Sequence, residues 1–352
     1  METKSQSRRS FLQHGAKAGA ALLAFPYVIP SARAAPAHRM IFGHTFGAAS
    51  KDYVITGLDQ FKQLAEKYSG GKLVVDVHEA GSLGAQPVLP QKVLGGSVQG
   101  CQVSTTIFSN FSDVYNLLDL PYLFDSNEQF ERTIEKDAFF ASEFVTRPAK
   151  QGFQVVPGMW ANSGFRVLGM SKKVDRPVRR PADLKGIKVR TNGTRTEEVM
   201  FKLTTANPVS IAWGEAYQAL AQGAADALSV GLGPITATKI HEALSSVTLY
   251  DLNFNCHVTL LNKRWFDQLP AEVRDAILRA GRESWEFQKR EQKKADAAML
   301  ALWKDRGIQV IVLSAAEKAD WQAAVGFKRK EYDALKQAIG GSALDELLRM
   351  KA

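Results

Sequence analysis

The sequence has few of the residues that redox, metal-binding or membrane-spanning proteins need. Its two cysteines, Cys101 and Cys256, lie far apart and form no CxxC pair, so it lacks a dithiol redox motif and a cysteine metal knuckle. A disulfide between these two cysteines is one alternative. We favour two buried thiols, because spacing alone does not establish the geometry of a disulfide. One apolar stretch, residues 18–30, ends at a proline and is shorter than the roughly 20 residues of a membrane span. We therefore expect a soluble mature chain.

Recognised catalytic and phosphate-binding motifs are also missing. The sequence contains no GxGxxG, GxxxxGK or GxSxG, and its histidines show no HExxH or close HxH spacing. These patterns supply dinucleotide sites, phosphate cradles, nucleophile elbows and zinc sites. We therefore predict no catalytic residue, no cofactor and no metal site.

The net charge of +9 taken alone favours a nucleic-acid partner. Part of the excess lies in the first 34 residues, whose basic side chains are Lys4, Arg8, Arg9, Lys17 and Arg33. Further along, basic and acidic residues are mixed, as in KREQKKAD at 289–296. Such mixing is typical of a solvated helix face, so we expect no nucleic-acid partner.

The amino terminus has the pattern of an export signal. Arg8 and Arg9 precede a weakly apolar region rich in alanine and glycine, and Ala32-Arg33-Ala34 supplies small residues for a signal peptidase. We predict that residues 1–34 are a signal peptide of the twin-arginine type, cleaved after Ala34, with the general secretory route as the alternative. The mature chain is expected in the periplasm. No cysteine follows the cleavage site, so we expect no lipid anchor.

The apolar periodicity predicts strands that alternate with helices. In the first part of the mature chain, strands are predicted at 39–46, 72–78 and 101–105, with helices at 52–68 and 86–95. In the second part, strands are predicted at 154–156, 165–168, 187–190 and 227–230, with helices at 194–204 and 214–222. Alternation of this kind indicates α/β sheets with crossover connections. The length of the mature chain favours two lobes.

The last part of the chain predicts a return to the first lobe. A strand at 256–261 precedes a long helical pattern at 270–305 that we expect to brace both lobes, followed by a strand at 308–313 and a closing helix at 315–337. The predicted segments are 1–34 for the signal peptide, 35–162 for the first lobe, 163–252 for the second lobe, 253–293 for the return and bracing helix, and 294–352 for a strand and helices that pack on the second lobe and the hinge.

Several motifs occur in an order that is more specific than any one of them. They are GSLG at 81–84, GGSV at 95–98, LDLPYLF at 118–124, LKGIKVR at 184–190, AWGEAYQAL at 212–220 with QGAAD at 222–226, and NKRWFDQLP at 262–270. This ordered set resembles the periplasmic solute-binding proteins of TRAP transporters, the DctP-type family. The resemblance spans nearly all of the mature chain.

The resemblance implies a fold, a function and partners. The implied fold is the α/β two-lobed periplasmic binding protein fold, type II-like or Venus flytrap, with crossing strands. The implied function is capture of a small organic acid between the lobes and delivery to a TRAP permease driven by an ion gradient, with no ATPase partner and with the protein as a monomer. An exported oxidoreductase or hydrolase is the main alternative, and a ligand-binding module of a membrane sensor is another.

The candidate site residues follow from what a carboxylate needs and from the family pattern. A guanidinium offers a planar fork that stays charged when water is expelled. Arg190 stands where the family carries its carboxylate-binding arginine, and Arg166 corresponds to a second family arginine. Trp213 stands where the family places an aromatic residue against the ligand. From the first lobe we add Phe46 and Ser104, whose hydroxyl can bond a ligand oxygen.

Two further positions carry expectations about specificity. Glu215 is expected to make backbone or hinge contacts, because a carboxylate in the cleft would repel an anion. Val230 stands where many relatives carry an asparagine. Loss of that amide disfavours a heavily hydroxylated acid and favours a smaller or partly apolar one. C4-dicarboxylates, 2-oxo acids, 2-hydroxy acids and aromatic acids all stay open.

Overall fold

The computed structural model describes residues 38–47, 53–135, 139–174 and 176–351. The predicted signal peptide, residues 1–34, lies outside the described residues. Among the helices that are described, none combines the length and the apolar character that a membrane crossing needs. Cys101 and Cys256 are both buried thiols, and burial raises the pKa of each. This confirms the interpretation that we favoured for the two cysteines.

Two separate sheets organise the described residues, which belong to one compact unit. The first has five strands in the order β2-β1-β3-β10-β4 and the second has six in the order β11-β9-β5-β8-β6-β7. The first sheet contains β1 (His38–Gly43), β2 (Leu73–His78), β3 (Gly100–Ser104), β4 (Phe153–Phe165) and β10 (Phe254–Asn262). The second contains β5 (Val167–Ser171), β6 (Lys188–Thr191), β7 (Asn207–Ser210), β8 (Ala227–Val230), β9 (Leu244–Leu249) and β11 (Gln309–Val312). We call the parts built on these sheets the first lobe and the second lobe, and this architecture confirms the predicted two-lobed α/β fold class.

In the first lobe, β1 is parallel to β2 and β3, while β10 is antiparallel to β3 and β4. Helix α1 (Tyr53–Tyr68) buries Leu58, Phe61 and Ala65 against this sheet. These residues are three and four positions apart, so they lie on one helix face. Further helices of this lobe are α2 (Leu89–Leu94), α3 (Thr105–Phe108), η1 (Asp113–Tyr115), α4 (Asn116–Asp119), α5 (Asn127–Ile134), η2 (Phe140–Thr146), α7 (Arg147–Lys150) and α11 (Lys263–Gln268).

In the second lobe, β6 is parallel to β7 and β8, and β5 is antiparallel to β8 and β9. The helices are η3 (Pro181–Leu184), α8 (Arg195–Leu203), η4 (Trp213–Glu215), α9 (Ala216–Gln222), α10 (Leu232–Ala237) and η5 (Ile240–Ala243). The hydroxyl of Thr194 caps α8 by accepting a bond from the Glu197 amide. Helix α9 ends at Gly223, whose left-handed conformation (φ 83°) glycine adopts without strain.

The chain first crosses between the sheets at one residue, Arg166; it returns between β9 and β10 and crosses again through α12 to β11. The two strands predicted at 154–156 and 165–168 are present as β4 and β5, but the predicted bounds are wrong. Strand β4 runs continuously from Phe153 to Phe165, and only Arg166 separates it from β5. Pro157, Gly158 and Gly164 interrupt the apolar alternation that sequence reasoning follows. The long pairing with β10, with its shifts in register, holds this segment extended.

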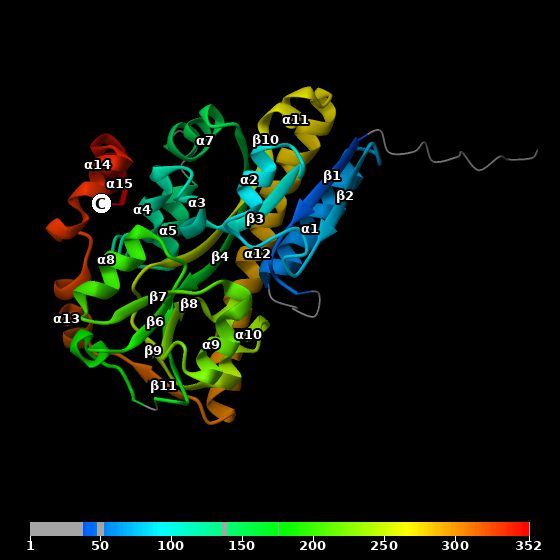
Figure 1. Cartoon of the computed structure of the whole chain (residues 1–352). Coiled ribbons are helices and arrows are strands. Elements are labelled where there is room, and N and C mark those ends of the chain that lie inside the picture. Colours follow the sequence, from blue (N-terminus) through cyan, green and yellow to red (C-terminus); the bar gives the residue numbers. More distant parts are fainter. Residues whose placement is uncertain (1–37, 48–52, 136–138, 175, 352) are drawn as a thin grey trace, which may run out of the picture. The chain divides into compact units, whose positions relative to one another are not determined.

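A long helix and a broken C-terminal segment complete the fold. Helix α12 (Ala271–Asp305) contacts α1 and β4 of the first lobe and α10 and β11 of the second (Figure 1), as predicted. The single closing helix predicted at 315–337 is wrong. The chain instead forms α13 (Ala315–Val325), η6 (Lys330–Tyr332), α14 (Asp333–Ile339) and α15 (Gly341–Lys351).

The break follows from the backbone at Gly326, which is extended and ends α13. Beyond it, the Phe327 amide donates to the carbonyl of Pro121. Trp321 of α13 packs in the second-lobe core, whereas Tyr332 and Leu347 pack in the core of the first lobe. The expectation that the whole stretch 294–352 packs on the second lobe and the hinge is therefore wrong for α14 and α15.

Candidate functional site

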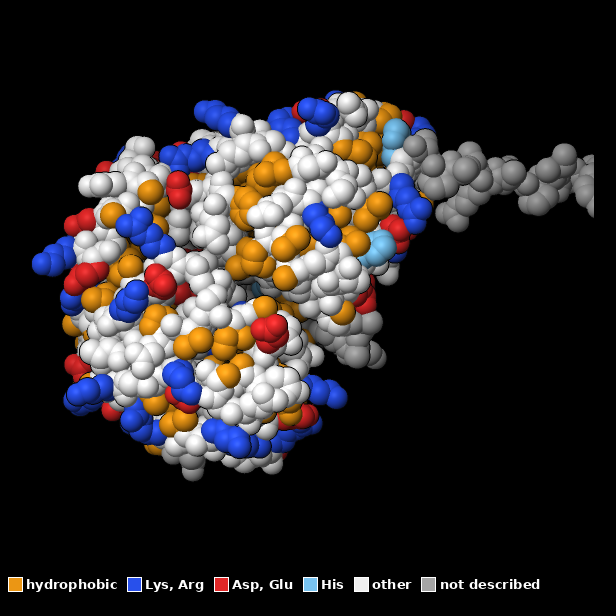
Figure 2. Space-filling model, viewed as in Figure 1, with side chains coloured by type: hydrophobic (Ala, Val, Ile, Leu, Met, Phe, Trp, Pro, Cys, Tyr) orange, Lys and Arg blue, Asp and Glu red, His pale blue; other side chains and the backbone are white. Residues whose placement is uncertain are grey.

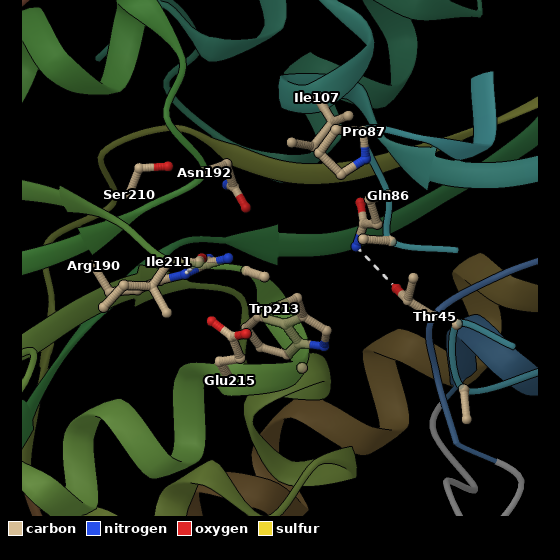
Figure 3. Close-up of a pocket in the computed structure, with 15 residues that line it drawn as sticks. Thr45, Gln86, Pro87, Ile107, Arg190, Asn192, Ser210, Ile211, Trp213 and Glu215 are labelled. Atoms are coloured by element: carbon tan, nitrogen blue, oxygen red, sulfur yellow. Dashed lines mark hydrogen bonds between the residues drawn. The ribbon is translucent and has the colours of Figure 1, made fainter. Parts of the chain in front are cut away.

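A cavity of about 390 Å³ lies where residues of the two lobes meet. Figure 2 shows the surface hollowed along this junction. We call this cavity the outer chamber (Figure 3), and its lining includes Thr45, Gln86, Pro87 and Ile107 from the first lobe and Arg190, Asn192, Ser210, Ile211, Trp213 and Glu215 from the second. The volume falls within the range of about 300–1,000 Å³ that small-molecule sites occupy.

A smaller pocket of about 20 Å³ adjoins the outer chamber. We call it the inner pocket, and it is lined by Phe46, Gln86, Ser104, Arg166, Arg190, Asn192, Trp213, Val230, Pro234, Asn255 and His257. The two cavities share Gln86, Arg190, Asn192 and Trp213. The structure thus places all five predicted site residues around one small pocket, although they come from both sheets and from positions far apart in the chain.

Arg190 has a guanidinium that is positioned but largely unsatisfied. It lies on β6, which pairs with β7 and β8, and its side chain is 3% exposed. Its Nε donates to the carbonyl of Ile211 at 2.8 Å, and its Cζ lies 5.5 Å from the centre of the Trp213 ring. Within the described part of the chain, neither terminal nitrogen makes a hydrogen bond. Burial lowers the pKa of Arg190 to about 10, which leaves it charged at neutral pH.

Arg166 has a guanidinium whose two terminal nitrogens both have protein partners. Nη1 donates to the carbonyl of Ser229 at 2.8 Å and Nη2 donates to Thr106 Oγ1 at 2.7 Å. The carboxylates of Asp119 and Glu197 lie 3.9 and 3.7 Å from these nitrogens. Since Thr106 and Asp119 belong to the first lobe and the other two to the second, the side chain joins both lobes at the crossing. Only Nε of Arg166 is left without a partner among the described residues.

Asp119 and Glu197, the two carboxylates that lie within 4 Å of Arg166, differ in their surroundings. Burial raises the pKa of Asp119 to about 7, and nearby Glu197 adds to the rise, while Arg166 and the bond from Thr106 oppose it. Glu197 accepts hydrogen bonds from the amide of Asn192 at 2.7 Å and from Asn192 Nδ2 at 3.0 Å. Arg166 and these two carboxylates therefore form a buried cluster, whereas no described carboxylate forms an ion pair with Arg190.

Several buried donors around the inner pocket have no partner among the described residues. They are Arg166 Nε, Trp213 Nε1, Asn255 Nδ2 and the Ser104 hydroxyl. An unsatisfied buried polar group costs about 1–3 kcal/mol, so a group of them in one pocket indicates a ligand that supplies acceptors. A carboxylate has only acceptors. The pocket therefore has the donors and the positive charge that recognise an organic anion.

Apolar side chains complete the inner pocket. Phe46 is almost fully buried and packs edge-on against the His257 ring, with centroids 5.1 Å apart. The Phe46 amide donates to His44 Nδ1 at 3.2 Å, and burial lowers the pKa of His44 to about 4, so this imidazole is neutral at pH 7. Val230 and Pro234 are also part of the lining. These groups can cover the carbon skeleton of an acid.

Sequence reasoning missed three amide side chains in this site: Gln86, Asn192 and Asn255. Gln86 bridges two first-lobe groups by donating to Thr45 Oγ1 at 3.1 Å and accepting from the Ser104 amide at 2.8 Å. Asn255 lies on β10, all of whose residues are buried. A buried polar residue in such a strand was a usable signal. Gln86 and Asn192 lie outside the predicted strands' apolar pattern and gave no comparable signal.

The expectation for Glu215 is wrong. Its carboxylate makes no hydrogen bond or ion pair with any residue that the structure describes. It therefore makes neither the backbone contacts nor the hinge contacts that we expected. Glu215 ends η4, is exposed and lines the outer chamber, and Figure 3 shows it next to Trp213. Val230 does line the inner pocket, but the amides of Asn192 and Asn255 supply polar groups close by.

Among the described residues, no three or more His, Cys, Asp or Glu side chains lie together so that they could hold a metal ion. The inner pocket is instead built from arginine, amide, hydroxyl and indole donors. The residues present therefore fit an anion better than they fit a cation.

Comparisons with known proteins identify the family of this chain. A family model described as bacterial extracellular solute-binding protein, family 7, matches residues 42–334. A solute-binding protein of Verminephrobacter eiseniae is 28% identical over 82% of this chain and 83% of its own. The C4-dicarboxylate-binding periplasmic protein DctP of Rhodobacter capsulatus is 25% identical over 82% and 84%.

The fold is also found in a solved structure. A TRAP periplasmic solute-binding protein from Ralstonia eutropha, crystallised with (S)-2-acetolactate, superposes with a TM-score of 0.81 at 22% identity, covering 89% of this chain and 98% of its own. The family model spans most of the chain, including both lobes and the crossing. This chain therefore belongs to family 7 of the bacterial extracellular solute-binding proteins, the DctP family.

Proposed function

We propose that this protein binds a small organic acid between its lobes and delivers it to a TRAP-type permease driven by an ion gradient. The observation that carries the proposal is the inner pocket, where a buried arginine with unsatisfied terminal nitrogens lies among buried donors that also lack partners. A carboxylate satisfies these donors and compensates the charge of Arg190. Family membership supports the solute-binding role.

Each side chain has a distinct part in binding. The two terminal nitrogens of Arg190 hold both carboxylate oxygens, because the planar guanidinium matches their spacing. Arg166 Nε and Asn255 Nδ2 donate to the ligand from the crossing region, and Ser104 donates from the first lobe. Trp213 covers the skeleton of the acid and offers Nε1 as a further donor. Phe46 forms the apolar wall on the first-lobe side.

Closure of the lobes follows from the distribution of these groups. Arg190 and Trp213 belong to the second lobe, whereas Ser104, Phe46 and Gln86 belong to the first. A ligand that contacts both sets favours the closed arrangement by the free energy of the contacts formed only there. Arg166, held by groups of both lobes, is the fixed point of this motion.

Export and partners complete the proposal. The relative from Rhodobacter capsulatus is named as a periplasmic C4-dicarboxylate-binding protein and the Ralstonia eutropha structure contains a 2-hydroxy acid, which supports an acid as ligand and the periplasm as location. The arginine pair at 8–9 supports the twin-arginine route. The mature protein acts as a monomer, with no ATPase partner.

The experiment that tests this function is native mass spectrometry of the mature protein as purified, followed by denaturation and identification of released small molecules. A released carboxylic acid that rebinds to the stripped protein supports the proposal. A protein that carries nothing, and whose melting temperature is unchanged by a broad panel of organic acids, contradicts it.

A further inference from the structure

Asn192 lies where the inner pocket and the outer chamber meet. It follows β6, the strand that carries Arg190, and both residues line both cavities. The inner pocket has about 20 Å³ of space, whereas a single water needs roughly 10–15 Å³. A ligand group that reaches Asn192 inside this pocket is therefore close to the carboxylate that Arg190 holds.

The side-chain amide of Asn192 is held in one orientation by Glu197. The Glu197 carboxylate accepts from the Asn192 backbone amide at 2.7 Å and from Asn192 Nδ2 at 3.0 Å. Glu197 is held in turn, because Thr194 Oγ1 donates to its Oε2 at 3.2 Å and Arg166 Nη1 lies 3.7 Å from its Oε1. A carboxylate has no proton to donate, so it takes the Nδ2 end of the amide and leaves Oδ1 directed away from it.

Asn192 Oδ1 is therefore presented to the ligand as an acceptor. Figure 3 shows this side chain directed into the chamber between Arg190 and Gln86. Within the part of the chain that the structure describes, no group donates a hydrogen bond to Oδ1. The neighbouring Arg166 Nε and Trp213 Nε1 are donors without a described partner. The site thus offers a ligand one oriented acceptor as well as several donors.

We propose that the site selects 2-hydroxy acids and that Asn192 is the specificity-determining residue, whose Oδ1 accepts the hydrogen bond of the 2-hydroxyl group. Glu197 is a positioning residue, because it acts through Asn192. This inference rests on the proposed function, since it assumes that an organic acid binds with its carboxylate at Arg190. It chooses one class among the acids that the sequence left open.

The physical basis is that a hydroxyl group both donates and accepts. It can donate to Asn192 Oδ1 and accept from one of the donors nearby. A 2-oxo group only accepts, so its oxygen would face Oδ1 with no proton between them, and an unsubstituted acid would leave both the acceptor and the donors unpaired. A site built to bond a ligand hydroxyl rejects analogues that lack it, because its own polar groups are then left without partners.

The selection acts at carbon 2 and not at the distal end of the ligand. The outer chamber is lined by the polar residues Thr45, Gln86, Ser210 and Glu215 as well as by alanine, proline and isoleucine side chains. This mixed lining can accept ligand bodies of more than one kind. The distal group is therefore varied in the test, while the comparison is made at carbon 2.

The test compares acids that share a carbon skeleton and differ at carbon 2. One series is 2-hydroxy-3-methylbutanoate, 3-methyl-2-oxobutanoate and 3-methylbutanoate, and the other is 2-hydroxyglutarate, 2-oxoglutarate and glutarate. Each acid, with the hydroxy acids as separate enantiomers, is titrated calorimetrically into the mature protein after bound ligand has been stripped. In the series that binds, we expect one enantiomer of the hydroxy acid to bind at least about tenfold more tightly than the other two acids.

Two variants test the residues. In Asn192→Ala the ratio of the hydroxy-acid affinity to the oxo-acid affinity should fall to within about twofold, because the acceptor is gone. In Glu197→Gln the carboxylate is replaced by an amide that can donate as well as accept. Asn192 can then turn Nδ2 toward the ligand, so the ratio should fall or reverse in favour of the oxo acid.

The control is Asn207→Ala, which removes an exposed amide on β7 outside both cavities and should keep the wild-type ratio. An oxo or unsubstituted acid that binds as tightly as its hydroxy acid overturns the inference while the proposed function stands. An unchanged ratio in Asn192→Ala overturns the role of Asn192. If no acid of either series binds, the inference fails, and the mass spectrum of the protein as purified decides separately whether the proposed function stands.

Discussion

Arg166 and Arg190 line the same pocket but differ in their hydrogen-bond and ion-pair partners. Both arginines are almost fully buried and both line the inner pocket. Arg166 is held by a carbonyl, a hydroxyl and two carboxylates from both lobes, whereas Arg190 has one carbonyl partner and an aromatic ring. Burial therefore does not distinguish the two arginines, and the unsatisfied terminal nitrogens of Arg190 are what make it the proposed carboxylate-binding residue.

The largest expected effect is on stability, in Arg166→Gln. At pH 8, above the pKa of Asp119 of about 7, removing this guanidinium leaves two buried carboxylates, Asp119 and Glu197, without their cation, which costs about 3–5 kcal/mol of unfolding free energy. Urea denaturation followed by circular dichroism measures this loss. The double variant Arg166→Gln with Asp119→Asn should recover part of it, because one uncompensated carboxylate is gone. If Arg166→Gln alone were as stable as the wild type, the cluster of Arg166 with Asp119 and Glu197 would not stabilise the fold at this crossing.

Arg190→Gln is the contrasting case, with a large effect on binding and a small one on stability. Loss of a charge-assisted contact costs about 1.5–3 kcal/mol, so affinity for the bound acid should fall by at least about tenfold in calorimetric titration. The unfolding midpoint should change little, because the guanidinium has one protein hydrogen bond. Arg279→Gln, which removes an exposed charge on α12, is the matched control and should bind normally.

The raised pKa of Asp119 predicts a dependence of stability on pH. Because its folded-state pKa is near 7 and its unfolded value near 3.9, the folded chain holds a proton that the unfolded chain has lost. Its contribution to stability is therefore complete below about pH 4 and is lost as the pH rises through 7, by at most about 1.4 kcal/mol per pH unit.

The measurement is the difference in unfolding free energy between the wild type and Asp119→Asn across pH 4.5–8. A difference is needed because His44, whose pKa burial lowers to about 4, contributes a slope of opposite sign below its ordinary pKa. As the pH rises, the unfolding free energy of the Asn variant should increase relative to that of the wild type. A difference that stays constant with pH would contradict the protonated Asp119.

The smallest expected effect belongs to Trp213→Phe. The ring that covers the ligand is kept and the Nε1 donor is lost, so affinity should fall by about fivefold, equivalent to one neutral hydrogen bond of about 1 kcal/mol. A ligand-induced change in tryptophan fluorescence should also be lost. The control is Trp265→Phe, on α11 outside the two cavities. It should retain the wild-type affinity and the ligand-induced fluorescence change. Persistence of the change in Trp213→Phe would assign the signal to another tryptophan.

The sequence predicted the fold well because its strands and helices have regular apolar periods. The bracing helix at 270–305 and the strand near 256–261 were predicted almost to their ends. The 13-residue strand β4 was not, because Pro157, Gly158 and Gly164 interrupt its pattern and pairing with β10 maintains it. The spacing of apolar residues within one segment does not reveal backbone pairing with a distant segment.

Arg190, Arg166 and Trp213 were predicted from the family pattern, and Phe46 and Ser104 were added from the predicted first lobe; all five line the inner pocket. Arg190 and Arg166 follow from motif positions and from the needs of a carboxylate, but their different surroundings depend on Thr106, Asp119 and Ser229, which the fold brings together from distant positions. Gln86 and Asn192 were missed because single amides carry no periodic signal. Glu215 was misjudged because its exposure depends on how η4 meets α9.

The most direct test is a crystal structure of the mature protein with the acid that it releases on denaturation, soaked or co-crystallised at saturating concentration. We predict that both oxygens of one carboxylate lie about 2.7–2.9 Å from the terminal nitrogens of Arg190, while Arg166 keeps its bonds to Ser229 and Thr106. A carboxylate held elsewhere in the cleft, with the Arg190 nitrogens still without a partner, would contradict the central claim.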